Sequence, residues 1–191
     1  INTTSGAIFI LTDATAGANV WTNTGGTSGD IAPKWYGGRG IEIGAQGSGS
    51  SAIDYITIAT LGNGTTFGTL AVAGGEGTCV SNGSRAFAAG GYTGGYSNVI
   101  EYITIATPGN GTDFGDLYSG RTNTAGASNF TRAIIQGGGN GAATNMIQYF
   151  TMATPGNGLN FGNATTSRQD SGTASSGTRA VFMGGSYTNV I

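Results

Sequence analysis

The residues in this sequence that could do chemistry are few. Asp113 and Asp116 flank a Phe-Gly pair and could supply oxygen ligands to Ca²⁺, or two carboxylates for general acid and base chemistry. Related segments of the chain lack the two acids, and the spacing matches no calcium-loop pattern, which favours a solvated turn. The chain contains no histidine, the commonest general base and metal ligand. We therefore expect no enzyme activity, no cofactor and no metal site.

Composition narrows the classes of partner. Cys79 is the single cysteine, which excludes an intramolecular disulfide and a cysteine-based metal site, and we expect it to be a small buried hydrophobe. Only 8% of residues are charged, the net charge is −2, and the seven cationic residues are scattered, so no nucleic-acid partner is expected. The longest apolar run, residues 7–11, is far shorter than the ~20 residues that span a bilayer. We expect no membrane insertion.

Aromatic side chains in two irregular segments are the candidates for ligand contacts. Rings among small polar residues suit sugar stacking or a protein contact, and the alternative is burial in the core. For Trp21 the core is favoured, because it stands where other parts of the chain carry a recurring phenylalanine. The four remaining candidates are Trp35, Tyr36, Tyr92 and Tyr96.

The elements that must position these residues recur along the chain. One tyrosine and one phenylalanine recur at steps of 47 residues, and one arginine at steps of 46, 47 and 47. A fixed period of this length is typical of solenoids, propellers and arrays. The recurring positions are Tyr55, Tyr102 and Tyr149; Phe67, Phe114 and Phe161; and Arg39, Arg85, Arg132 and Arg179.

Each repeat contains strand and turn signals and no helical periodicity. The arginine begins an apolar segment that runs into glycines, as in residues 85–91. The next strand, exemplified by residues 98–107, is apolar on both faces except for one polar position, which predicts cover on both sides. A Pro-Gly-Asn-Gly segment then predicts a tight hairpin turn with positive φ at Asn-Gly. Four short strands in 47 residues match one blade of a β-propeller.

The recurring arginines allow two interpretations. If the units close about an axis, the four guanidinium groups could converge and hold an anion or a glycan carboxylate. Alternatively, each arginine bonds carbonyls or stacks on an aromatic ring of the adjoining unit. Recurrence in every unit favours the structural interpretation, because a functional site usually breaks the symmetry of its repeats.

The two ends of the chain are in the same phase of the repeat. Residues 186–191 begin the apolar strand, and residues 7–21 resemble a degenerate version of the rest of that strand, the turn and the aromatic residue of the next strand. We therefore expect a single domain over residues 1–191, with units at about 39–84, 85–131 and 132–178, and a fourth formed by 179–191 joined with 1–38. Residues 7 to about 30 would then close a four-bladed ring without open sheet edges. The alternative is a piece of a longer repeat array.

The order of arginine, strand, Gly-Gly, strand tyrosine, turn and aromatic residue resembles the kelch repeat. More specifically, the segment NVIEYITIATPGNGTDFGDL, residues 98–117, is similar to a kelch-like repeat of virion structural and tail-fibre proteins of tailed phages, especially marine cyanobacterial ones. The resemblance covers residues 39–191 clearly and 1–38 loosely. The sequence departs from kelch repeats in carrying phenylalanine where they have tryptophan.

The resemblance implies an all-β, kelch-like β-propeller used for assembly or attachment, and it carries no catalytic residues across. We expect a non-enzymatic protein of the virion or the extracellular space, whose partners are copies of itself or other virion proteins. A carbohydrate-binding module that contacts a host surface glycan through aromatic loops is the second hypothesis. A propeller hydrolase or oxidase is the third and is disfavoured by the missing histidine.

Overall fold

The computed structural model describes residues 9–13, 20–23, 38–44, 50–72 and 74–186. The chain divides into two compact units, Ile1–Trp35 and Tyr36–Ile191. All regular structure in the described residues is β-strand, and every sheet is antiparallel, so the all-β prediction is confirmed. The described part of the chain contains no helix long and apolar enough to cross a membrane.

In the smaller unit, the described residues form one pair of antiparallel strands, β1 (Phe9–Asp13) and β2 (Val20–Asn23), which we call the β1–β2 hairpin. In this pair Leu11 lies opposite Trp21. The register shifts between Leu11 and Asp13. The described residues thus place one strand inside residues 7–21 and a second that begins at Val20, where a strand-turn-strand segment was expected.

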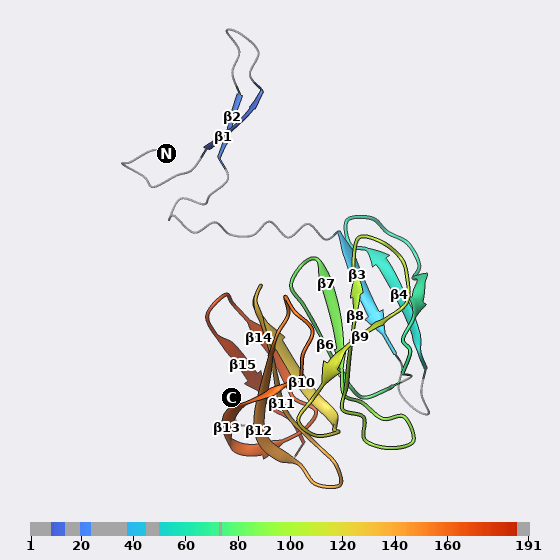
Figure 1. Ribbon diagram of the computed structural model, residues 1–191, viewed down its shortest axis with the longest axis vertical. Helices are drawn as coiled ribbons and strands as arrows, with labels where there is room; N and C mark the ends of the chain where they lie inside the picture. The colour runs from blue at the N-terminus through green and yellow to red at the C-terminus, as the bar shows by residue number, and fades with distance from the viewer. Residues whose placement is uncertain (1–8, 14–19, 24–37, 45–49, 73, 187–191) are drawn as a thin grey trace, which may run out of the picture. The chain divides into compact units, whose positions relative to one another are not determined.

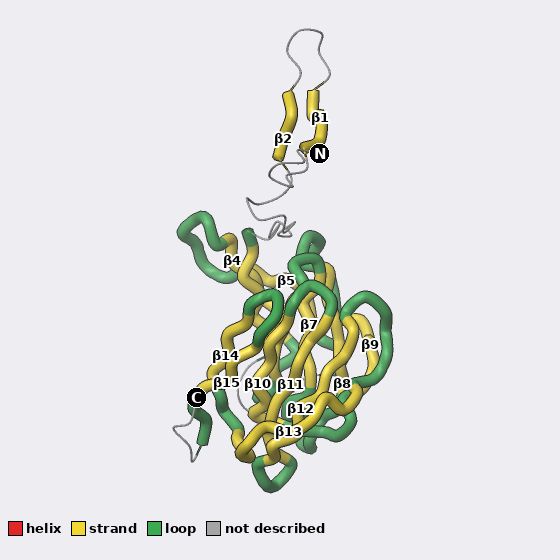
Figure 2. Tube along the Cα trace, turned by 90° about the vertical axis from the view of Figure 1, so that its left-hand side faces the viewer, coloured by secondary structure: helices red, strands yellow, loops and turns green. Residues whose placement is uncertain are grey.

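The larger unit contains four sheets in chain order (Figures 1 and 2). Within each sheet every strand pairs with the next one along the chain, which is a meander. Sheet I consists of β3 (Arg39–Ile43), β4 (Ala52–Thr57) and β5 (Thr65–Thr69). Sheet II consists of β6 (Thr78–Ser81), β7 (Arg85–Ala89), β8 (Val99–Thr104) and β9 (Thr112–Asp116). Sheet III consists of β10 (Thr122–Ser128), β11 (Arg132–Gly139), β12 (Thr144–Thr151) and β13 (Leu159–Arg168). Sheet IV consists of β14 (Gly172–Ser175) and β15 (Ala180–Met183).

Neighbouring sheets enclose apolar cores. Between sheets I and II lie Ile53, Phe67, Leu70, Ala86, Ile103 and Ile105. Between sheets II and III three rings meet, with centroid distances of 5.0 Å for Phe87 and Phe114, 5.5 Å for Phe87 and Phe150, and 5.6 Å for Phe114 and Phe150. Strand β8 contributes to both cores, through Ile103 on one face and Ile100 on the other. The predicted cover on both faces is therefore confirmed for this strand.

The first strands of successive sheets are also linked to one another. Ser128 Oγ donates a 2.8 Å hydrogen bond to the carbonyl of Ser81, and Ser175 Oγ donates a 2.9 Å bond to the carbonyl of Ser128. The three serines occupy one repeat position, 47 residues apart. Strands β6, β10 and β14 thus form a chain of contacts across sheets II, III and IV.

The Gly-Gly segments turn the chain as predicted. Gly90 and Gly91 have φ values of 72° and 114°, and Gly137 and Gly138 have 67° and 73°. A side chain is strained in this conformation, and a Cβ on Gly90 would also come within 2.8 Å of the carbonyl of Arg121. The pair is therefore required by both backbone conformation and space.

The predicted conformation of the Pro-Gly-Asn-Gly segments is wrong. Neither Asn110 nor Gly111 has a positive φ, and the same holds for the corresponding residues of the other two segments. The chain instead reverses just before this segment, where the N–H of Thr107 donates a 3.1 Å bond to the carbonyl of Thr104. Residues 108–111 are free to reach the preceding sheet, and their bonds to it replace those of a hairpin turn.

Candidate functional site

The most regular contacts among the described residues are hydrogen bonds between successive sheets. We call each place where two successive sheets are bonded in this way a joint. In the joint between sheets I and II, the N–H of Gly111 donates to the carbonyl of Thr69 at 2.8 Å, and Asn110 Oδ1 accepts from the N–H of Thr69 at 3.1 Å. In the next joint, the N–H of Gly158 donates to the carbonyl of Asp116 at 2.7 Å, and Asn157 Oδ1 accepts from the N–H of Asp116 at 3.0 Å. We call each such set of bonds an asparagine latch.

The glycine of the Phe-Gly pair makes room for the latch. A Cβ on Gly115 would lie 2.5 Å from the carbonyl oxygen of Gly156, and a Cβ on Gly68 would overlap the carbonyl oxygen of Gly109. The phenylalanine before each glycine is the extra residue of a β-bulge, since the register shifts opposite Phe67 and Phe114. The bulge turns these rings into the cores, where Phe67 is 4% exposed and Phe114 is 2% exposed.

The side chain at the single polar position of β8 and of β12 forms hydrogen bonds at the same joints. The carboxylate of Glu101 accepts the N–H groups of Ala71 at 2.8 Å and Val72 at 3.0 Å. In the next unit, Gln148 Oε1 accepts the N–H of Tyr118 at 2.6 Å. Both side chains are buried, so these bonds satisfy polar groups that would otherwise be unpaired in the interior.

The recurring arginine, tyrosine and phenylalanine form one stack per unit. The guanidinium carbons of Arg39, Arg85 and Arg132 lie 4.5–4.7 Å from the ring centroids of Tyr55, Tyr102 and Tyr149. Each tyrosine in turn meets the phenylalanine of its own unit edge to face, at 5.9–6.1 Å.

The arginines also reach the following unit. Arg39 Nη1 donates to the carbonyls of Ile105 at 2.7 Å and Ala106 at 2.8 Å, and Arg85 Nη1 donates to the carbonyl of Ala153 at 3.4 Å. These contacts match the structural interpretation of the arginines, except that the ring on which each one stacks belongs to its own unit.

Some apolar residues in or directly after the strands of sheets I and III are exposed, although the residues at the same repeat positions in other units are buried. Phe161 is 54% exposed, although its counterparts Phe67 and Phe114 are buried. In and directly after β4, Ile56 and Ile58 are 48% and 65% exposed, although the equivalent residues in and directly after β8 and β12 are buried. A cavity of about 380 Å³ lies beside Phe161, lined also by Ile134, Ile147, Arg179 and Phe182. In the described residues sheet IV has two strands, where sheet III has four.

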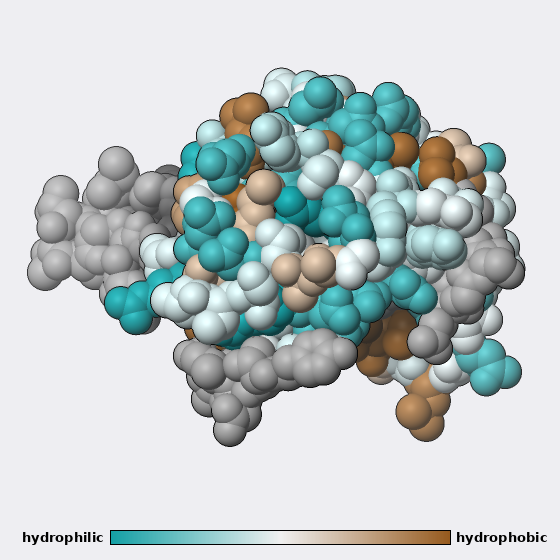
Figure 3. Space-filling model, turned by 90° about the horizontal axis from the view of Figure 1, so that it is seen from below, coloured by the Kyte–Doolittle hydropathy of each residue, from teal (hydrophilic) through white to brown (hydrophobic). Residues whose placement is uncertain are grey.

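Two of the four aromatic candidates lie in the described residues. Tyr92 and Tyr96 are 38% and 47% exposed in the loop between β7 and β8. Their rings meet edge to face with centroids 6.0 Å apart, so they contact each other instead of forming one flat stacking platform. Trp35 and Tyr36 lie outside the described residues. Figure 3 shows a mostly polar face on which hydrophobic residues form separate patches.

The acidic pair does not form a metal site with other residues. Asp113 is exposed and Asp116 is partly buried, and the backbone of Asp116 is engaged in the asparagine latch. Among the described residues no three acidic, cysteine or histidine side chains lie close enough to hold a metal ion.

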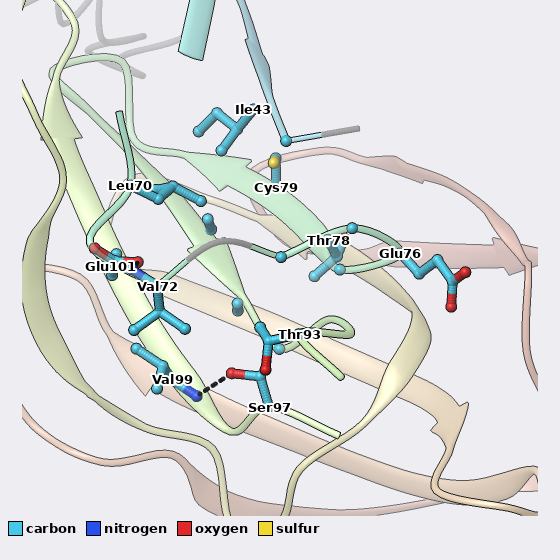
Figure 4. A pocket seen from close by; sticks show the side chains of 17 residues that line it. Ile43, Leu70, Val72, Glu76, Thr78, Cys79, Thr93, Ser97, Val99 and Glu101 are labelled. Atoms are coloured by element: carbon cyan, nitrogen blue, oxygen red, sulfur yellow. Dashed lines mark hydrogen bonds between the residues drawn. The ribbon is translucent and has the colours of Figure 1, made fainter. Parts of the chain in front are cut away.

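A second cavity, of about 220 Å³, lies between sheets I and II beside the Gly-Gly turn (Figure 4). Its walls include Ile43, Leu70, Val72, Cys79 and Glu101. Cys79 is exposed at this wall, so the expectation of a buried cysteine is wrong. Surrounding protein atoms nevertheless desolvate the thiol and raise its pKa from 9.0 to about 11. A thiol that stays protonated at neutral pH is a poor nucleophile and a poor metal ligand.

Two buried arginines were missed by the sequence analysis. Arg121 and Arg168 are 47 residues apart at one repeat position, and both are almost fully buried. Arg121 donates to Ser119 Oγ at 2.9 Å and to the carbonyl of Gly137 at 3.3 Å, and burial lowers its pKa. Their 47-residue spacing was the available signal. It shows that these arginines, like the four recognised ones, belong to the repeat.

No protein-family model matches the chain, and no curated protein is significantly similar to it.

Proposed function

We propose that this protein is a non-enzymatic structural component of a virus particle, located at the virion surface or in a tail fibre and used for assembly or host attachment. Its partners are copies of itself or other virion proteins. The kelch-like phage repeat that the sequence resembles supports the viral assignment. The observation that carries the structural assignment is the use of the recurring polar residues. In the described residues, the latch asparagines, the buried Glu101, Arg39 and Arg85 bond to backbone groups of neighbouring repeat units.

The proposed form is a four-bladed, kelch-like propeller closed by residues 7 to about 30. Two observations support this closure. Apolar positions that are buried at the internal joints are exposed at both ends of the row of sheets. Sheet IV has two strands, and the β1–β2 hairpin has two strands in a segment that resembles the missing half of a repeat. Placing one on the other would bury the exposed positions by the contacts that bury their counterparts.

A pair of glycine variants tests the closure. Gly115 and Gly162 have nearly the same φ, 146° and 143°, but only Gly115 is covered by a Pro-Gly-Asn-Gly segment. In the proposed closed ring the β1–β2 hairpin would lie next to sheet III and cover Gly162. Gly162→Ala should then lower the free energy of unfolding about as much as Gly115→Ala. A Gly162→Ala variant that loses much less stability than Gly115→Ala would contradict closure.

The viral assignment has its own test. Antibodies raised against the chain should label intact particles purified from the source, at a regular place on the particle surface or fibre in immunogold electron micrographs. Recovery of the protein only from particle-free fractions would contradict this assignment and would leave the propeller proposal standing.

A carbohydrate-binding module is the second candidate, favoured by the exposed Tyr92 and Tyr96 in the loop between β7 and β8. A host surface glycan would be its ligand. A glycan array should then give a signal that Tyr92→Ala and Tyr96→Ala abolish while the far-ultraviolet circular dichroism stays unchanged. Absence of any signal with the unaltered protein would exclude a lectin for the glycans tested.

A further inference from the structure

The chain contains five Asn-Gly pairs, which begin at Asn63, Asn82, Asn110, Asn140 and Asn157. An Asn-Gly pair can modify itself. The backbone nitrogen of the glycine attacks the side-chain carbonyl carbon of the asparagine, a new C–N bond forms, the bond to the amide nitrogen breaks, and ammonia leaves. Water then opens the cyclic imide to aspartate or to isoaspartate. Glycine favours this reaction because it has no side chain to obstruct ring closure.

The structure holds three of these pairs in hydrogen bonds that oppose the reaction. In both asparagine latches the glycine nitrogen, which is the nucleophile, donates to a carbonyl of the preceding sheet, and the asparagine Oδ1 accepts a backbone N–H. Gly158 is buried and Gly111 is partly buried. Asn82 Oδ1 accepts the N–H groups of Ser84 at 3.1 Å and Arg85 at 2.8 Å, which fixes its side chain.

Asn63 and Asn140 differ from these three. Both asparagines are exposed, and neither they nor their glycines form a hydrogen bond to any other described residue. Asn63 occupies the same repeat position as Asn110 and Asn157. Within the larger unit no described sheet precedes sheet I in the chain, so the segment of Asn63 has no counterpart there of Thr69 or Asp116.

Ring closure as proposed above would not supply the missing latch. The latch needs glycine after the aromatic residue of the preceding strand, since a Cβ at Gly68 or Gly115 would meet the incoming segment. In β2 the residue after Trp21 is Thr22. The segment of sheet I also begins with Leu61 where the two latched segments begin with proline.

We propose that Asn63 and Asn140 are sites of spontaneous deamidation in the folded protein, and that the latches protect Asn110 and Asn157. The product at Asn63 places a new carboxylate, and in the isoaspartyl form an extra backbone carbon, in the first repeat unit. This inference does not depend on the viral assignment.

The experiment is peptide mapping by mass spectrometry after incubation of the whole chain at mildly alkaline pH, with fragment ions that assign the modified residue. Asn63 and Asn140 should convert about tenfold faster than Asn110 and Asn157, because two hydrogen bonds must open before a latched pair can react. In urea all five pairs should convert at similar rates, which controls for local sequence. Equal rates at Asn63 and Asn110 in the folded protein would overturn the proposal.

A variant tests whether the latch itself protects Asn110. Gly68→Ala should displace the segment that holds Asn110 from sheet I. Deamidation should then become faster at Asn110 alone, while the rate at Asn157 stays low. If the variant were broadly unfolded, all five rates would rise together, and the matching rise at Asn157 would identify that case. An unchanged rate at Asn110 in folded Gly68→Ala would show that the latch does not protect this asparagine.

Discussion

The carboxylate of Glu101 lies 2.8 Å from the backbone nitrogen of Ala71, thirty residues earlier in the chain and in the preceding repeat. Glu101 is 3% exposed, and its second oxygen accepts the N–H of Val72. One side chain therefore satisfies two backbone donors in the connection that follows the last strand of sheet I. The strand that carries it is otherwise apolar, so the contact fixes which residues of the two sheets lie opposite each other.

Glu101→Ala should lower the free energy of unfolding by about 2–4 kcal/mol, since it leaves backbone donors unpaired at a buried joint. Glu101→Gln should lose less, because Gln148 makes the corresponding contact with one oxygen. Chemical denaturation followed by circular dichroism measures both. Glu42→Ala, an exposed glutamate of sheet I, is the control and should change stability little. A Glu101→Ala protein as stable as the control would refute a stabilising joint.

Gly68→Ala tests the space that the asparagine latch requires. A Cβ at Gly68 overlaps the carbonyl oxygen of Gly109, and the φ of Gly68 is not in the positive range, so the effect is steric. We expect a loss of roughly 1–3 kcal/mol, as for overpacking elsewhere. Gly62→Ala is the matched control, because a Cβ there meets no atom within 4 Å. Equal melting temperatures of the two variants would show that the joint can move to accommodate the methyl group.

The arginine stack separates into two contributions. Arg39 stacks on Tyr55 and bonds two carbonyls of the next unit at 2.7 and 2.8 Å, whereas Arg85 makes the same stack on Tyr102 with one longer bond of 3.4 Å. Arg39→Ala should lower the free energy of unfolding by about 1 kcal/mol more than Arg85→Ala does. If Arg85→Ala lost as much stability, the stack within the unit would account for the whole effect.

The Cys79 thiol should react slowly in the folded protein. Its pKa is raised from 9.0 to about 11, so at pH 8 the folded protein has less thiolate than the unfolded chain. Alkylation by iodoacetamide should accelerate with pH up to about 11 in the folded protein and level off near 9 in urea. A folded-state profile that levels off near 9 would show that the thiol is fully hydrated.

The raised pKa of the Cys79 thiol also makes the stability of the folded protein depend on pH. Below pH 9 the thiol is protonated in both states and makes no difference between them. As pH rises through 9 towards 11, the unfolded chain ionises first, which favours unfolding. Cys79→Ser should therefore reduce the loss of stability in this window, measured for each protein relative to its own stability at neutral pH.

The 47-residue period was sufficient to predict the all-β class, the cover on both faces of β8 and the Gly-Gly turns, because these depend on local patterns of apolar residues and glycine. It was insufficient for the Pro-Gly-Asn-Gly segments. Their sequence fits a hairpin turn, but bonds to Thr69 and Asp116, some forty residues away, determine their conformation. The role of Glu101 was also hidden, since its partners are backbone groups that no side-chain pattern reveals. Arg121 could have been found from its spacing to Arg168 alone.

Small-angle X-ray scattering of the whole chain tests whether the repeat units close into a ring, as proposed. A compact 191-residue monomer should have a radius of gyration of about 16 Å. A closed ring should give this value, monomeric mass from the forward scattering, and a distance distribution with a single maximum. A clearly larger radius at monomeric mass, with a second maximum from a separate hairpin, would contradict closure. A mass of two or more chains would show instead that the exposed ends are covered by other copies.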